Sequence, residues 1–343
     1  MGGPSFYLLL ILMLLPIGCT KKKRPTLNTY ITESEKMKAA LGYQKKALGK
    51  KGIHRSEALL RAARLYLEIR DNKNARATLG KIVADKQSTP RTRGRALYLL
   101  CKHWGKYNSC LMPIIIHYPD TVAAEDSLLL YLPLLERKGI EQFSHQLSAL
   151  YMRLKKTNLA DNILYRLGKR LSAEEGKGNL VLFGKSVTYA QAAWVSFDLL
   201  LKSHPNSSLR DDAIYDGSKV LHRLGRIKEA ISLLSTFLKA RSSSWFFGEY
   251  NSQLMDDAWL LCASLHIENG NFSKGFSMLL GLPKEFPTSR LRDDAHYKAV
   301  MAAIHAQKTS LACSAMASFL KKYKRSRHYP TVRRLRTRCE RKP

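Results

Sequence analysis

The stretch Phe286-Pro287-Thr288-Ser289-Arg290-Leu291-Arg292-Asp293-Asp294-Ala295 decides how this chain folds, because two earlier segments share its frame. In each copy an acidic residue follows a proline by seven positions: Pro119 and Asp126, Pro205 and Asp212, Pro287 and Asp294. A proline cannot continue a helix, so each one marks a helix end, and the Ser, Thr or Asn just after it is expected to cap the next helix.

A glycine completes the frame. It follows the acid by thirteen positions at Gly139 and Gly225, and a further copy runs from Asp257 to Gly270, whereas the copy that starts at Pro287 has Gln307 there. A glycine at this place ends a helix and permits a left-handed turn into an antiparallel partner. The pairs Asp211-Asp212, Asp256-Asp257 and Asp293-Asp294 are expected in the first turn of a helix, where the helix dipole favours negative charge.

The spacing of the frame predicts one helix pair per unit. The prolines lie 86 and 82 residues apart, which corresponds to two units each time. The second helix of each unit carries a small residue that lets the two helices approach closely: Ala193, Ala230, Gly275 and Ala312. We therefore predict an all-α fold, an α-solenoid of antiparallel helix pairs over residues 55–324.

These residues also carry a family resemblance. The tetratricopeptide pattern is matched at Trp259, Ala263, Gly270, Gly275 and Pro287. The stretch from Phe286 to Ala295 resembles the repeats of BamD- and YbgF-like outer-membrane lipoproteins, specifically over 205–323 and more weakly over 55–200. The resemblance implies a superhelix that binds protein partners of the cell envelope, such as those of β-barrel assembly, the Tol-Pal system or peptidoglycan synthesis.

Other parts of the repeat region are less regular. An early unit is expected over 56–84, with Ala77 as its small residue, and another over 95–117. Two segments interrupt the pattern and are interpreted as loops, 171–188 and 242–251. The second contains Trp245-Phe246-Phe247, which is either a contact patch or part of a loop that covers the core.

The N-terminus is interpreted as a signal peptide over residues 1–18. Its apolar run, 6–18, is shorter than the roughly 20 residues that cross a bilayer, and it ends at Cys19. The run resembles a bacterial lipobox, which implies that Cys19 carries diacylglycerol and an amide-linked palmitate. Thr20 in place of an aspartate then implies an outer-membrane lipoprotein facing the periplasm. The alternative is a reversed anchor, because the basic cluster 21–24 follows the run and no basic residue precedes it.

Charge is concentrated at the two ends. The chain has 58 Lys+Arg against 27 Asp+Glu, and its last segment, 321–343, has eleven basic residues against Glu340 alone. Residues 19–54 are interpreted as a basic tether with one short helix over 33–48, and 325–343 as a basic tail or capping helix. Such ends either keep the protein soluble or contact an anionic lipid or polysaccharide. Nucleic acid is not expected as a partner of an exported protein.

Signatures of catalysis are missing from the sequence. It contains no phosphate loop, dinucleotide fingerprint or zinc-protease motif, so we expect no catalytic residues, no cofactor and no metal. Adjacent Asp-Asp pairs point about 100° apart on a helix and do not converge on one substrate atom. A different class, a relative of the lytic transglycosylases that lacks their catalytic domain, stays open as an alternative.

Cysteine usage leaves a choice open. With Cys19 lipidated, five cysteines remain, so at least one is a free thiol in an oxidising compartment. Cys101 and Cys110 either form a bridge across the turn at Gly105 or stay buried and unpaired.

Overall fold

The computed structural model describes residues 32–174, 178–239, 242–244, 248–250 and 252–340. Cys19, the apolar run before it and Trp245-Phe246-Phe247 lie outside these residues. Contacts divide the chain after Ser88 into two units, and each is described by itself.

The first unit contains three helices: α1 (Glu33–Leu48), α2 (Gly52–Glu68) and α3 (Asn72–Ala84). Helix α1 begins with a capping box, because the Thr32 hydroxyl accepts from the Glu35 amide and the Glu35 carboxylate accepts from the Thr32 amide. It packs on α2 and pairs Lys36 with Glu68 at 2.9 Å. The helical part therefore begins before residue 55, inside the segment that the sequence assigns to the tether.

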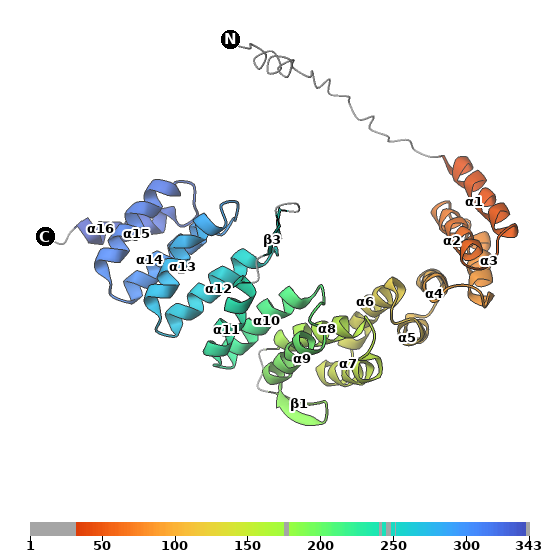
Figure 1. Cartoon of the computed structure of the whole chain (residues 1–343), viewed down its shortest axis with the longest axis horizontal. Coiled ribbons are helices and arrows are strands. Elements are labelled where there is room, and N and C mark those ends of the chain that lie inside the picture. The colour runs from red at the N-terminus through yellow and green to blue at the C-terminus, as the bar shows by residue number, and fades with distance from the viewer. Residues whose placement is uncertain (1–31, 175–177, 240–241, 245–247, 251, 341–343) are drawn as a thin grey trace, which may run out of the picture. The chain divides into compact units, whose positions relative to one another are not determined.

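The second unit, from Thr89 onward, contains thirteen helices within the described residues. They are α4 (Pro90–Trp104), α5 (Tyr107–His117), α6 (Val122–Glu136), α7 (Ile140–Leu154), α8 (Ala160–Ser172), α9 (Tyr189–Ser203), α10 (Arg210–Arg223), α11 (Ile227–Lys239), α12 (Met255–Glu268), α13 (Phe272–Glu285), α14 (Arg292–His305), α15 (Thr309–Lys322) and α16 (Tyr329–Glu340). Successive helices pack antiparallel in pairs (Figure 1). The predicted all-α solenoid of helix pairs is confirmed.

The prolines of the frame lie at matching corners. Pro119, Pro205 and Pro287 each follow the end of the second helix of a pair, α5, α9 or α13. After Pro119 the predicted cap is present, because the Thr121 hydroxyl accepts from the Ala124 amide at 3.3 Å. After Pro205 and Pro287 the serine does not cap the next helix directly. Instead it makes a short turn before that helix: the Ser207 hydroxyl accepts from the Leu209 amide at 3.0 Å, and Ser289 accepts from Leu291 at 3.0 Å.

The acids predicted in first turns lie there, and the remaining acid of the frame, Asp126, has a different role. Asp212, Asp257 and Asp294 lie in the first turns of α10, α12 and α14. Asp126 lies beyond the first turn of α6, whose acid there is Glu125. Asp126 instead forms an ion pair with Arg95 of α4, so it connects two helix pairs rather than stabilising a helix end.

The turn glycines adopt the expected left-handed backbone. The φ angles are 91° at Gly139, 73° at Gly225 and 83° at Gly270. Gln307 takes the same conformation at φ 55° although it has a side chain. The turn is therefore a property of the frame, and glycine is the residue that adopts it at least cost.

The small residues of the second helices are buried at helix contacts. Ala193 and Ala230 are 0% exposed and Ala312 is 3% exposed. A Cβ added to Gly275 would lie 2.5 Å from the carbonyl oxygen of Ala263, so only glycine fits there. In the early repeat the prediction of Ala77 is wrong, because Ala77 is exposed and Ala75 is fully buried in its place.

Both predicted loops contain hairpins instead. Strands β1 (Asn179–Leu182) and β2 (Lys185–Thr188) pair antiparallel, and β3 (Ser242–Ser244) pairs with β4 (Gly248–Tyr250). The first hairpin turns at Phe183 and Gly184, which both have positive φ, and buries Leu180 and Leu182. This hairpin contacts α7 and α9, so it extends the core rather than leaving it.

Two disulfides join helices within the second unit. Cys101 pairs with Cys110 across the α4–α5 turn, which selects the bridged alternative, and Cys313 of α15 pairs with Cys339 of α16. Cys262 is a buried free thiol. In the described part of the chain, every helix is too short or too polar to span a bilayer.

Candidate partner-binding face

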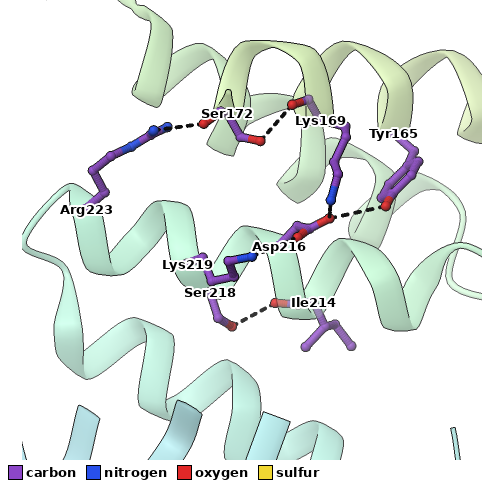
Figure 2. Close-up of polar contacts among 8 residues, drawn as sticks. All are labelled: Tyr165, Lys169, Ser172, Ile214, Asp216, Ser218, Lys219 and Arg223. Atoms are coloured by element: carbon purple, nitrogen blue, oxygen red, sulfur yellow. Dashed lines mark hydrogen bonds and ion pairs between the residues drawn. The ribbon is translucent and has the colours of Figure 1, made fainter. Parts of the chain in front are cut away.

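The first helices of successive pairs bring polar side chains together at one junction. Lys169 and Tyr165 of α8 both reach Asp216 of α10: the lysine Nζ lies 2.7 Å from Oδ2, and the tyrosine hydroxyl donates to the same oxygen at 3.2 Å (Figure 2). Lys219, one turn along α10, lies 3.6 Å from the other oxygen. A carboxylate that is 8% exposed thus has a partner for each oxygen, as a buried charge requires.

A second contact fastens the same two helices. The Arg223 guanidinium, at the end of α10, donates to the carbonyl oxygen of Ser172 at 2.8 Å, near the end of α8 (Figure 2). Burial, and then the Asp216 charge, raise the pKa of Tyr165 far above that of an ordinary tyrosine. The phenol therefore stays protonated and donates its hydrogen bond throughout the physiological range.

The next junction repeats the arrangement. Tyr215 and Lys219 of α10 occupy the places in their helix that Tyr165 and Lys169 occupy in α8. Burial raises the pKa of Tyr215, and the charge of Asp257 on α12 adds to the effect. At two consecutive junctions, a Tyr-x-x-x-Lys sequence on the first helix of one pair thus lies near an aspartate on the first helix of the next pair.

Two carboxylates of this face form no ion pair within the described chain. Asp212 and Asp257 are half-buried, and neither pairs with a described residue. Burial and neighbouring carboxylates raise the pKa of each, whereas the charge of Lys169 lowers that of Asp212 and the charge of Lys219 lowers that of Asp257. The raising effects are the larger at both positions, so the nearby lysines compensate the negative charge only in part.

This arrangement is suited to recognition rather than to chemistry. A partly buried carboxylate without an ion-pair partner gains from a cation supplied from outside, so a Lys, Arg or amino group of a partner suits Asp212 or Asp257. Tyr215, which is partly exposed, offers rigid contact area beside Asp257. Tyr165, by contrast, is buried against Asp216. In the residues that the structure describes, no group of three or more His, Cys, Asp or Glu side chains is placed to hold a metal ion.

The sequence located part of this face. It singled out Asp212 and Asp257 as helix-start acids, and Trp259 as a pattern residue. Trp259 instead joins the helices of one pair, because its indole nitrogen donates to the Met278 carbonyl oxygen at 2.7 Å. The cluster around Asp216 was missed, although the repeated Tyr-x-x-x-Lys step was a signal that could have located it.

Comparisons with known proteins agree with a helical repeat. A tetratricopeptide repeat model matches residues 57–85, which cover most of α2 and all of α3. No curated protein sequence matches the chain. Among solved structures, a monomeric mutant of IFIT1 with m7Gppp-AAAA is 12% identical, with a TM-score of 0.41 over 90% of this chain and 76% of that chain. The chain thus carries a tetratricopeptide-type repeat in an array of helix pairs.

Proposed function

We propose that this protein is a non-catalytic scaffold that binds protein partners in the cell envelope, anchored to the outer membrane by lipid on Cys19. The observation that carries the binding role is the pair of half-buried carboxylates without an ion-pair partner in the described chain, Asp212 and Asp257, on successive first helices of the array. Arrays of helix pairs present such faces to extended peptides or helices of partners. The partner segment that suits this face is basic.

The compartment is inferred from cysteine chemistry and the N-terminus. Disulfides persist in oxidising compartments such as the periplasm, and four of the five cysteines after Cys19 are paired. The short apolar run before Cys19 suits a cleaved signal peptide, and several acyl chains on one residue give stable anchoring. Both features support export followed by lipidation.

The binding role is tested with a double variant, Asp212→Asn with Asp257→Asn, in affinity capture of the full-length protein from membranes. We expect recovery of the partner to fall by about tenfold, because two charge-assisted contacts are lost. The variant should fold at least as well as the parent, since it removes charges that are unfavourable in the folded state.

The matched control is Asp198→Asn, which removes an aspartate from the second helix α9, where it pairs with Lys202 at 2.6 Å. Capture by this variant should equal that of the parent. Equal loss in the control, or unchanged capture by the double variant, would refute binding at this face.

The anchor is tested separately by globomycin treatment of cells that make the protein. An unprocessed precursor should accumulate, and Cys19→Ser should prevent both processing and membrane retention. If processing and retention are unaffected by either change, the protein is not a lipoprotein.

A further inference from the structure

A strongly basic cavity lies at the end of the second unit, away from the face described above. The connection from α13 to α14 and the connection from α15 to α16 together line a cavity of about 460 Å³. Asp293 is the one carboxylate among its lining residues. Six cationic side chains line it: Arg290, Arg292, Lys321, Lys322, Lys324 and Arg325. We refer to this site as the corner cavity.

The cations of the corner cavity are unneutralised. All six are exposed, and none forms an ion pair with a described residue. Two of the nearby acids are engaged elsewhere: Asp294 binds Arg327 at 2.8 Å and His328 at 2.6 Å, and Asp256 accepts from the Ser289 hydroxyl at 2.6 Å. Asp293 lines the cavity, and its single charge leaves most of the positive charge uncompensated. The positive charge of the cavity is therefore available to a ligand.

The floor of the cavity is ordered and rich in donors. Arg292 is held by its Nε, which donates to the Ser289 carbonyl oxygen at 2.9 Å, so its terminal nitrogens remain free to bind. Tyr323 packs its ring against His296 and Phe319, and its burial raises the pKa of the phenol, which keeps the hydroxyl protonated. Guanidinium, ammonium and hydroxyl donors together suit an anion with several oxygens.

The fold itself does not require these charges. The corner after α9 makes the same serine turn, Ser207 to Leu209, as the corners at Ser289 and Ser326, yet 202–210 contains only two Lys or Arg residues, Lys202 and Arg210. The corner before α12 also makes this turn, and 252–255 contains no basic residue. Basic side chains are thus added at the last two corners, where they converge.

We propose that the corner cavity binds a ligand that carries clustered phosphate groups. A volume of 460 Å³ exceeds that of one phosphate ion and suits a polyphosphorylated group or the headgroups of an anionic lipid surface. This site is independent of the carboxylate face, which attracts the opposite charge.

The test is calorimetric titration of the purified full-length chain with tripolyphosphate, and sedimentation with vesicles of phosphatidylglycerol or of phosphatidylcholine. The test variant is Lys322→Gln, Lys324→Gln, Arg325→Gln. The matched control is Lys155→Gln, Lys156→Gln, Lys228→Gln, which removes the same charge at exposed sites elsewhere in the unit. Thermal unfolding checks that both remain folded.

We expect the cavity variant to weaken binding by about tenfold and the control by less than about twofold, since local contacts outweigh the net charge. Binding of tripolyphosphate identifies a soluble phosphate cluster as a ligand, and binding of phosphatidylglycerol vesicles alone identifies a lipid surface. Equal loss in the two variants would show a general charge effect and overturn the proposal. Failure of the parent chain to bind either probe would also overturn it.

Discussion

The junction of α8 with α10 and the junction of α14 with the segment leading to α16 occupy equivalent places in the repeat but are held by different chemistry. In the middle of the unit, Asp216 is buried and accepts from Tyr165 and Lys169. At the end, Asp294 is more exposed and binds Arg327 and His328. The difference shows that the frame fixes where helices meet, while each junction is free to vary in the groups that join them.

Helix α16 is joined to the rest of the second unit by a disulfide as well as by packing. Val332 is fully buried from α16, and the disulfide from Cys339 to Cys313 ties this helix to α15. An interior helix such as α10 buries apolar residues against both neighbours. The disulfide thus adds a covalent link to the packing of α16 on α15, as the Cys101–Cys110 bridge does for α4 and α5.

The largest effect should follow from Cys313→Ser with Cys339→Ser. The bridge spans 26 residues, and its loss should reduce the free energy of unfolding of the α15–α16 region by about 3 kcal/mol. Hydrogen exchange should show loss of protection in α16 while α10 stays unchanged. Unchanged protection in α16 would mean that packing alone holds the last helix.

An intermediate effect is expected from Asp216→Asn in the middle junction. The free energy of unfolding should fall by about 1–2 kcal/mol, because the charge-assisted bond to Lys169 is lost and the Tyr165 hydroxyl donates to a weaker acceptor. Asp198→Asn, at an exposed pair, should change it by less than about 0.5 kcal/mol. Urea unfolding measures both, and equal effects would remove the distinction between a buried junction and a surface pair.

A smaller effect should come from exchanging the turn residues of the two regions. Gly225→Gln places a side chain at φ 73° and should cost about 1 kcal/mol, whereas Gln307→Gly relieves φ 55° and should stabilise by about 0.5 kcal/mol. Thermal unfolding of the two variants measures the shifts. If both substitutions shifted stability in the same direction, the two turns would not be equivalent.

The smallest effect is an opposite response of the two regions to acid. Burial opposes ionisation of Asp294, but hydrogen bonds from Arg327 and His328 outweigh it and lower its pKa below 3.8. Its stabilisation is therefore present above pH 3.8 and lost as the pH falls through the lowered value. Asp212 and Asp257 have raised pKa values, so their ionised forms destabilise the folded chain. This destabilisation is present at higher pH and disappears as the pH falls toward 3.8.

Amide protection factors measured on both sides of pH 3.8 test this response. Acidification should strengthen protection in α10 and α12 relative to α14 and α16. Parallel changes in all four helices would contradict the assignment of the two aspartate environments.

Much of the fold could be predicted because the residues that end its helices act locally. Pro205 and Gly225 act through their own backbone, so sequence alone indicated the corner and the left-handed turn. The small residue of the early repeat was misplaced from Ala75 to Ala77, since no proline precedes that repeat to set the register. The hairpin around Phe183-Gly184 was missed because its four-residue strands carry too short an alternation to distinguish from a loop.

The candidate sites depend on contacts between distant parts of the chain. Asp216 meets Tyr165 across 51 residues, and Cys313 meets Cys339 across 26, so neither could be inferred from neighbouring residues. The basic corners were visible as a charged end of the chain. Their convergence around one cavity depends on stacking of two helix pairs, which sequence spacing alone does not place.

The most direct test of partner binding is photo-crosslinking in living cells from two matched lysine positions. A crosslinking residue at Lys219, an exposed position of α10 whose charge acts on Asp257, should give a partner adduct, and the same residue at Lys228 of the second helix α11 should give none. Adding Asp212→Asn and Asp257→Asn should abolish the adduct from position 219. Equal adducts from both positions, or an adduct that persists without the two carboxylates, would contradict binding at the first-helix face.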